Sequence, residues 1–172
     1  MTKTLLTLGL LLALLPARAA SPREDLARAA LLLQAGREQE ALPALFRAAA
    51  ADDPYAQNIL ALILYRGQSV ARNCELAAEW WEKAARQNLP QAQYNLGLCY
   101  ALGCGVPPSP EQAVHWWKRA AEQGMPDAAY NLALCYRHGY GVERNAQLEK
   151  TYLQLAGAQQ PDTRAQNSPT PN

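Results

Sequence analysis

Apolar and small residues recur at helical spacing along most of the chain, and residues 92–102 show the pattern most clearly. One stripe of this segment is formed by Ala92, Leu96, Cys99, Tyr100 and Gly103. The Gly-x-Gly triplet at 103–105 follows, and glycine readily adopts the positive φ angles that end a helix. The pattern predicts a helix that ends in a turn.

A second helix is predicted after this turn. Ser109 stands at its N-cap, Pro110 at its first position and Gln112 three residues after the cap, which is a capping-box pattern. Its buried face is predicted to carry Ala113, Trp116, Trp117, Ala120 and Ala121. Gly124 is suited to end it. The two helices therefore form a hairpin.

The same pattern returns when the sequence is shifted by 36 residues in either direction. Positions that align include Leu60, Leu96 and Leu132; Gly67, Gly103 and Gly139; Asn73, Ser109 and Asn145; and Pro54, Pro90 and Pro126. The pair Trp80–Trp81 becomes Trp116–Trp117, and then Tyr152–Leu153. One hairpin cannot bury both tryptophans alone, so the units are expected to stack.

A family resemblance follows from these repeats. The run Ala-x-Tyr-Asn-Leu-Gly-x-x-Tyr, then Gly-x-Gly-Val, then Ala-x-x-Trp-Trp-x-x-Ala-Ala-x-x-Gly resembles the Sel-one-like repeat, a relative of the tetratricopeptide repeat. It covers residues 54 to about 157, and repeat 1 departs from it at Tyr65, Gln68 and Ser69. The resemblance implies an all-α fold, a right-handed superhelical solenoid of antiparallel helix pairs.

The segment before the repeats is interpreted as one further hairpin. A helix over 24–34, a turn at 35–36 and a second helix from 38 to about 50 keep the register but include no tryptophan, as expected of a capping unit. The predicted organisation is a signal peptide at 1–19, an N-terminal capping hairpin at 20–52, repeat 1 at 53–89, repeat 2 at 90–125, repeat 3 at 126–158 and a disordered tail at 159–172.

The two ends of the chain differ from the repeats in composition. Lys3, the apolar run 5–15 and Ala17-Arg18-Ala19 are typical of a cleaved signal peptide, and the run is shorter than the about 20 residues that span a bilayer. An uncleaved anchor is the alternative. The polar, proline-containing segment 159–172 is interpreted as a tail, with a docking peptide as the alternative.

Charge argues against a nucleic-acid partner. The formal net charge of +1 becomes −1 when Lys3 and Arg18 are removed with the signal peptide, and no Lys/Arg block is present. No integral membrane segment is expected after cleavage.

Four cysteines in an exported chain indicate disulfides. All four are expected on one edge of the stack, and Cys99 with Cys135 is disfavoured because equivalent slots lie about 8–10 Å apart. The favoured prediction is Cys74–Cys99 with Cys104–Cys135. Pairing of Cys74 with Cys104 is kept as an alternative.

No active site, metal or cofactor is expected. A zinc site of Cys99, Cys104, Cys135 and His138 is the metal-binding alternative, but the repeat register already explains these positions and export favours oxidation. A Cys135–His138 thiolate pair is a further catalytic alternative. His115 and Ser109 have structural interpretations, and no nucleophile–base combination is apparent.

The first helix of each hairpin is expected to line a concave face that binds a protein or peptide. Its predicted binding residues, apolar and aromatic for the most part, are Asn58, Leu62, Tyr65, Arg66, Tyr94, Leu98, Leu102, Tyr130, Leu134, Arg137 and His138. Burial between repeats is the alternative for the tyrosines. The Trp pairs are assigned to packing.

The sequence is thus interpreted as an exported, periplasmic or secreted scaffold that is not an enzyme. By resemblance, such modules serve envelope or flagellar-motor assembly, and an immunity protein that binds a toxin is a second possibility within the binding class. Kinship with cysteine-rich relatives implies an enzymatic alternative, binding or hydrolysis of β-lactams or cell-wall fragments.

Overall fold

The computed structural model describes residues 20–158 and contains only α-helices in that range. The eight helices, each of 13 residues, are α2 (Pro22–Gln34), α3 (Glu38–Ala50), α4 (Pro54–Arg66), α5 (Cys74–Arg86), α6 (Pro90–Leu102), α7 (Pro110–Glu122), α8 (Pro126–His138) and α9 (Ala146–Ala158). The predicted signal peptide and tail lie outside the described residues.

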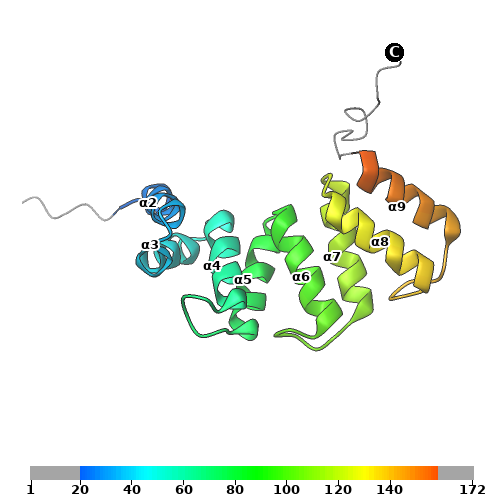
Figure 1. Cartoon of the computed structure of the whole chain (residues 1–172), viewed down its shortest axis with the longest axis horizontal. Helices are drawn as coiled ribbons and strands as arrows, with labels where there is room; N and C mark the ends of the chain where they lie inside the picture. The colour runs from blue at the N-terminus through cyan, green and yellow to red at the C-terminus, as the bar shows by residue number, and fades with distance from the viewer. Residues whose placement is uncertain (1–19, 159–172) are drawn as a thin grey trace, which may run out of the picture.

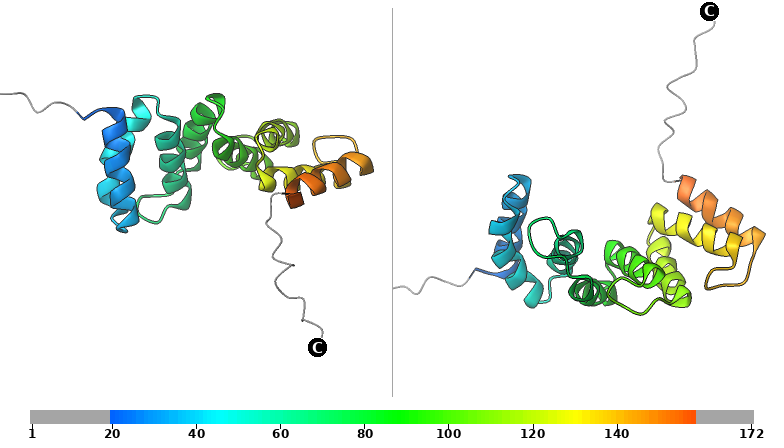
Figure 2. Two further views of the ribbon diagram at one scale, coloured as in Figure 1. Left: turned by 90° about the horizontal axis from the view of Figure 1, so that it is seen from above. Right: turned by 60° about the horizontal axis from the view of Figure 1, so that its bottom comes forward.

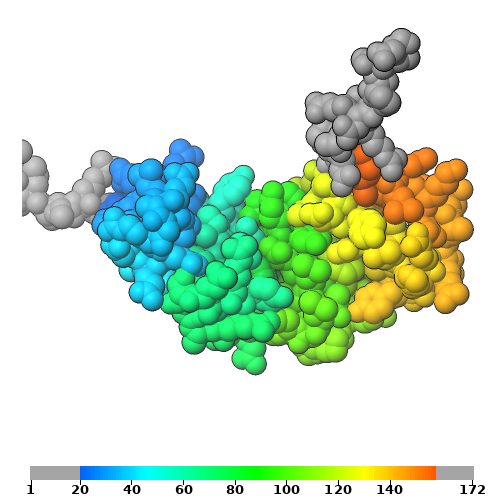
Figure 3. Space-filling view, viewed as in Figure 1, coloured from blue at the N-terminus to red at the C-terminus, as the bar shows by residue number. Residues whose placement is uncertain are grey.

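Successive helices pair as hairpins, and each hairpin packs against the next one (Figure 1). The stack curves into a crescent whose two ends bend toward the same side, with α4 and α6 on the inner side and α5 and α7 on the outer side (Figure 2). Neighbouring hairpins form one continuous body (Figure 3). This confirms the predicted all-α solenoid.

The helix ends use the residues that the repeat pattern singled out. Gly67, Gly103 and Gly139 close the first helices in the left-handed region, with φ of 66°, 68° and 74°. The side chains of Asn73, Ser109 and Asn145 accept hydrogen bonds from the backbone N–H groups three residues later. The loops at 67–73, 103–109 and 139–145 consequently lie along one edge of the stack (Figure 1).

The tryptophan pairs pack the interior, as predicted, with all four side chains buried. Trp81 Nε1 donates to Asn58 Oδ1 at 3.0 Å, and Trp117 Nε1 donates to the Tyr94 carbonyl at 3.2 Å. Each bond joins the second helix of a repeat to its own first helix, so these indoles fix the hairpin as well as fill it.

Two buried glutamines link consecutive units. Gln57 Nε2 donates to the Ala49 carbonyl at 3.2 Å, and Gln93 Nε2 donates to the Ala85 carbonyl at the same distance. Their side-chain carbonyls accept from Gln87 and Gln123 at 3.0 and 2.7 Å. These buried amides are therefore satisfied across the junction between hairpins. Gln57 and Gln93 occupy equivalent positions of repeats 1 and 2, 36 residues apart, but neither contact was predicted from the sequence.

The N-terminal hairpin has the expected two helices, and α2 begins at Pro22, two residues before the predicted start. Ser21 accepts from the Glu24 N–H and Glu24 accepts from the Ser21 N–H, which completes a capping box. Arg47 of α3 holds buried Asp25 of α2 through two hydrogen bonds of 2.5 and 3.1 Å. The role of this hairpin as a cap stays a prediction.

Candidate functional site

Four of the predicted binding residues meet in one hollow on the inner side of the crescent. Leu62 and Tyr65 of α4 face Leu98 and Leu102 of α6, and α5 contributes Trp81. Asn95, Cys99 and Cys104 complete the lining of a cavity of about 50 Å³. We call this hollow the α4–α6 pocket.

The side chains of the pocket are held by contacts with one another. The rings of Tyr65 and Trp81 lie 5.5 Å apart, centroid to centroid. Asn95 Nδ2 donates to Asn58 Oδ1 at 3.4 Å, the oxygen that also accepts from Trp81. Leu102 remains 68% exposed. The pocket therefore has a fixed floor and an apolar side chain free at its rim.

Toward the loop edge the pocket adjoins a second hollow. This hollow, of about 470 Å³, shares Tyr65, Leu102 and Cys104 with the pocket and adds Arg72, Cys74, Gly103 and Gly105. Arg72 is exposed, and its guanidinium carbon lies 5.1 Å from the centroid of the Tyr65 ring. A cation thus borders the apolar pocket.

The disulfide beside this opening corrects the favoured prediction from sequence. Cys74 pairs with Cys104, with their Cα atoms 5.5 Å apart. The predicted pairs Cys74–Cys99 and Cys104–Cys135 are wrong. Cys99 and Cys135 are free thiols buried on the core stripes of α6 and α8. The loop that carries Cys104 instead reaches back to the start of α5 in the preceding hairpin.

This backward contact recurs in every repeat. Ser69 donates to Glu38, the first residue of α3. A Cβ atom at Gly105 would lie 2.8 Å from the Glu75 nitrogen, and one at Gly141 would lie 2.9 Å from the Glu111 nitrogen. Each inter-helix loop therefore rests on the start of the second helix of the preceding hairpin, and the disulfide fixes one such contact covalently.

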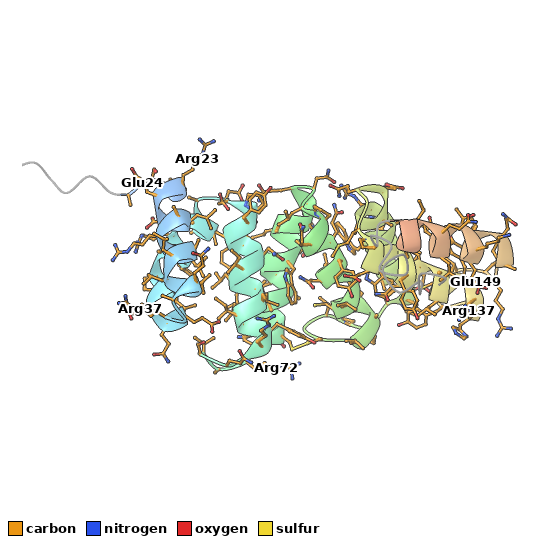
Figure 4. The ribbon with its side chains drawn as sticks, turned by 45° about the horizontal axis from the view of Figure 1, so that its top comes forward. Arg23, Glu24, Arg37, Arg72, Arg137 and Glu149 are labelled. Atoms are coloured by element: carbon orange, nitrogen blue, oxygen red, sulfur yellow. A yellow bond between two sulfur atoms is a disulfide. The ribbon has the colours of Figure 1, made fainter. Side chains whose placement is uncertain are left out.

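The predicted residues of repeat 3 do not join the pocket. Arg137 Nε donates to Glu149 Oε1 of α9 at 2.7 Å, at the opposite end of the molecule from α2 (Figure 4). Tyr130 is 51% exposed and borders another hollow, with Leu153. His138 is exposed and Leu134 half-buried.

The remaining predicted residues have mixed environments. Tyr94 is half-buried, and burial, with a smaller contribution from Asp127, raises the pKa of its hydroxyl against the effect of a hydrogen bond to Asn131. Arg66 is exposed at the end of α4. Asn58 is engaged by Trp81 and Asn95. Among the predicted binding residues, those that meet in the α4–α6 pocket therefore come from repeats 1 and 2.

The residues that we missed from sequence at this site are Trp81, Asn95 and Arg72. Asn95 and Asn131 occupy equivalent slots, a signal that was available. Arg72 was not predicted because it lies in an inter-helix loop, where the helical pattern gives no direction for a side chain. Its repeat-2 equivalent is Pro108.

The two free thiols, Cys99 and Cys135, are poorly suited to catalysis. Burial raises the pKa of Cys99 and of Cys135 to about 11, so both are neutral thiols near pH 7. The Cys135–His138 thiolate pair considered above requires the opposite shift. Among residues 20–158, no three His, Cys, Asp or Glu side chains gather as metal ligands would. No helix of the same range is long and apolar enough to cross a membrane.

Comparison with known proteins places these features in a family. The family model described as Sel1 repeat matches residues 54–89, 90–125 and 126–160. A Sel1 repeat protein from Oxalobacter formigenes is similar over 82% of this chain and 56% of its own, with 31% identity and a TM-score of 0.74.

Two further solved structures resemble the chain. A protective antigen present in uropathogenic Escherichia coli strains, which displays an SLR fold, matches 84% of this chain and 32% of its own, with 30% identity and a TM-score of 0.79. Cysteine rich protein B of Helicobacter pylori matches 58% of this chain and 77% of its own, at 24% identity and a TM-score of 0.54, and shares the fold.

No curated protein matches the chain. The chain spans about half the length of the Oxalobacter protein and about a third of the Escherichia antigen. The three matched segments cover more than half of the chain and coincide with its three tryptophan- or tyrosine-containing hairpins. The protein therefore belongs to the Sel1 repeat family.

Proposed function

We propose that the protein is an exported, non-catalytic repeat scaffold that binds a protein or peptide through the concave face. The observation that carries the proposal is the α4–α6 pocket, where Leu62, Leu98 and exposed Leu102 meet between α4 and α6, the helices on the inner side of the crescent. An apolar hollow with exposed apolar side chains at its rim is typical of interaction surfaces.

Export is supported by the disulfide and by the composition of the N-terminus. The Cys74–Cys104 bond would not persist in a reducing cytoplasm, and residues 1–19 have the sequence pattern of a cleaved signal peptide. A periplasmic or secreted location is the one that accommodates both.

The binding proposal is tested by substitution of Leu102, which is 68% exposed and can change without loss of core packing. Leu102→Asp places a charge at the rim of the pocket, so we expect it to abolish capture of a partner from a periplasmic extract. The matched control is Leu31→Asp, because Leu31 is 69% exposed on α2, away from the pocket. Capture that Leu102→Asp leaves intact, or that both substitutions abolish equally, would contradict the proposal.

The finer roles stay predictions. Envelope or flagellar-motor assembly and neutralisation of a toxin would both use a concave protein-binding face, and the identity of the captured partner distinguishes them. The enzymatic alternative, acting on β-lactams or cell-wall fragments, predicts turnover of a chromogenic β-lactam that is lost in Cys135→Ser. The buried, neutral Cys135 thiol gives that alternative no support.

A further inference from the structure

The helices that form the walls of the α4–α6 pocket are nearly free of charge. α6 has no charged residue, and α4 has only Arg66, its last. α5 and α7 on the outer side carry acids and bases, of which Glu82 and Arg86 pair at 2.6 Å. A ligand of the inner face therefore has to be apolar where it meets these walls.

The size of the pocket limits what can enter it. At about 50 Å³ the cavity has room for about four water molecules, since one water needs roughly 10–15 Å³. This suits one aliphatic side chain of three or four carbons. Trp81 and Leu98 line the cavity. Asn58 Oδ1 accepts hydrogen bonds from Trp81 and from Asn95, and these bonds fix the position of the Trp81 side chain.

Arg72 adds a charge at one side of this opening. Its guanidinium is positioned by the Tyr65 ring and by Cys104, whose Sγ lies 3.8 Å from Nη2. Within residues 20–158 Arg72 makes no ion pair, and Glu75, the nearest acid in sequence, makes none either. The edge of the planar guanidinium is thus free to donate to an acceptor from outside.

We propose that the α4–α6 pocket binds a peptide segment in which an aliphatic residue lies next to a carboxylate. The aliphatic side chain enters between Leu62 and Leu98, and the carboxylate, from Asp, Glu or a chain terminus, accepts hydrogen bonds from Arg72. This inference rests on the proposed function and specifies the chemistry of the partner. Charge complementarity favours an acidic peptide over a basic one.

A random peptide library displayed on phage and selected on the disulfide-bonded protein tests this directly. We expect enriched sequences to pair a Leu, Ile or Val with an acidic residue or a free C-terminus. A selected peptide, synthesised with a fluorophore, is then titrated against variants. Arg72→Gln should weaken its binding by about tenfold, since one charge-assisted hydrogen bond is lost.

Control variants separate the inference from the proposed function. Arg86→Gln removes an exposed arginine on the outer side and should leave affinity unchanged, whereas Leu102→Asp should abolish binding. Enriched peptides without an acid, bound equally by Arg72→Gln but lost in Leu102→Asp, would overturn the inference and leave the scaffold proposal standing. Failure to select any peptide, or peptides unaffected by Leu102→Asp, would overturn both.

A second copy of the chain is the rival occupant of the pocket. If the pocket were a dimer interface, the wild-type protein would elute as a dimer and Leu102→Asp as a monomer in size-exclusion chromatography, and this result would overturn the inference. We expect both proteins to elute as monomers.

Discussion

Trp117 lies directly against the backbone of Gly97, and this contact shows how one residue adapts a repeat. A Cβ at position 97 would lie 2.5 Å from Trp117 Cδ1, although Ala61 and Ala133 occupy the equivalent slots. The reason is that Trp117 bonds to the Tyr94 backbone carbonyl, whereas Trp81 bonds to the Asn58 side chain. The glycine makes room for the closer approach.

We therefore expect Gly97→Ala to destabilise the protein. Displacement of Trp117 is expected to cost about 1–3 kcal/mol, more than the gain of about 1 kcal/mol from replacing a helical glycine. Urea denaturation measures the change in the free energy of unfolding. Gly157→Ala in α9 is the matched control, because an added Cβ there would have no atom of another part of residues 20–158 within 4 Å, and it should stabilise. A Gly97→Ala variant as stable as the control would contradict the packing argument.

At the scale of elements, each hairpin is fixed by a small number of polar contacts between its two helices. In the N-terminal hairpin Arg47 of α3 and Asp25 of α2 form the contact, and Asp25 is only 3% exposed. The hydrogen bond from Arg47, and its charge, hold the pKa of Asp25 below the usual value of 3.8 against the opposing effect of burial.

This shift predicts how the stability of the hairpin depends on pH. Because the folded-state pKa is lowered, the ion pair stabilises fully above the unfolded-state pKa, and this contribution is lost as the pH falls through the folded-state value. Urea midpoints measured from pH 7 down to pH 3 should fall more steeply for the wild type than for Asp25→Asn. If the urea midpoints of the two proteins fell in parallel with pH, the Asp25–Arg47 pair would make no pH-dependent contribution to stability.

At the scale of the whole molecule, the contacts between hairpins hold the crescent together. The Cys74–Cys104 bond links two hairpins across 30 residues of sequence, at the edge of the α4–α6 pocket. It should stabilise by about 3–4 kcal/mol through its effect on the unfolded chain. The disulfide also fixes one wall of the second hollow, which Arg72 borders.

We expect reduction, or the double substitution Cys74→Ser with Cys104→Ser, to lower the free energy of unfolding by about that amount. Thiol titration of the unfolded, non-reduced protein should find two thiols, and a peptide map should join the segments that carry Cys74 and Cys104. A map that joins Cys74 to Cys99 would contradict the arrangement described above.

Sequence reasoning succeeded where the 36-residue period carries the information. It predicted the helix ends at Gly103 and Ser109 and the burial of the tryptophans. It failed at the disulfide because the period is the same whether a loop contacts the hairpin before it or the one after it. It did not predict the ion pair of Arg137 because the pattern of α8 alone does not contain Glu149, its partner in α9, and the place of Arg137 on a binding face stays a prediction.

The loop contacts give the two ends of the solenoid different roles, because the loop of each repeat rests on the preceding hairpin. Glu38, Cys74 and Pro110, which begin α3, α5 and α7, are each covered by the loop of the following hairpin, and Ala146 begins α9 in the equivalent slot. No loop among residues 20–158 covers Ala146. Since each unit needs only its predecessor as a platform, a further hairpin placed after α9 would leave the earlier hairpins untouched, and such an array can extend by tandem duplication of one 36-residue segment.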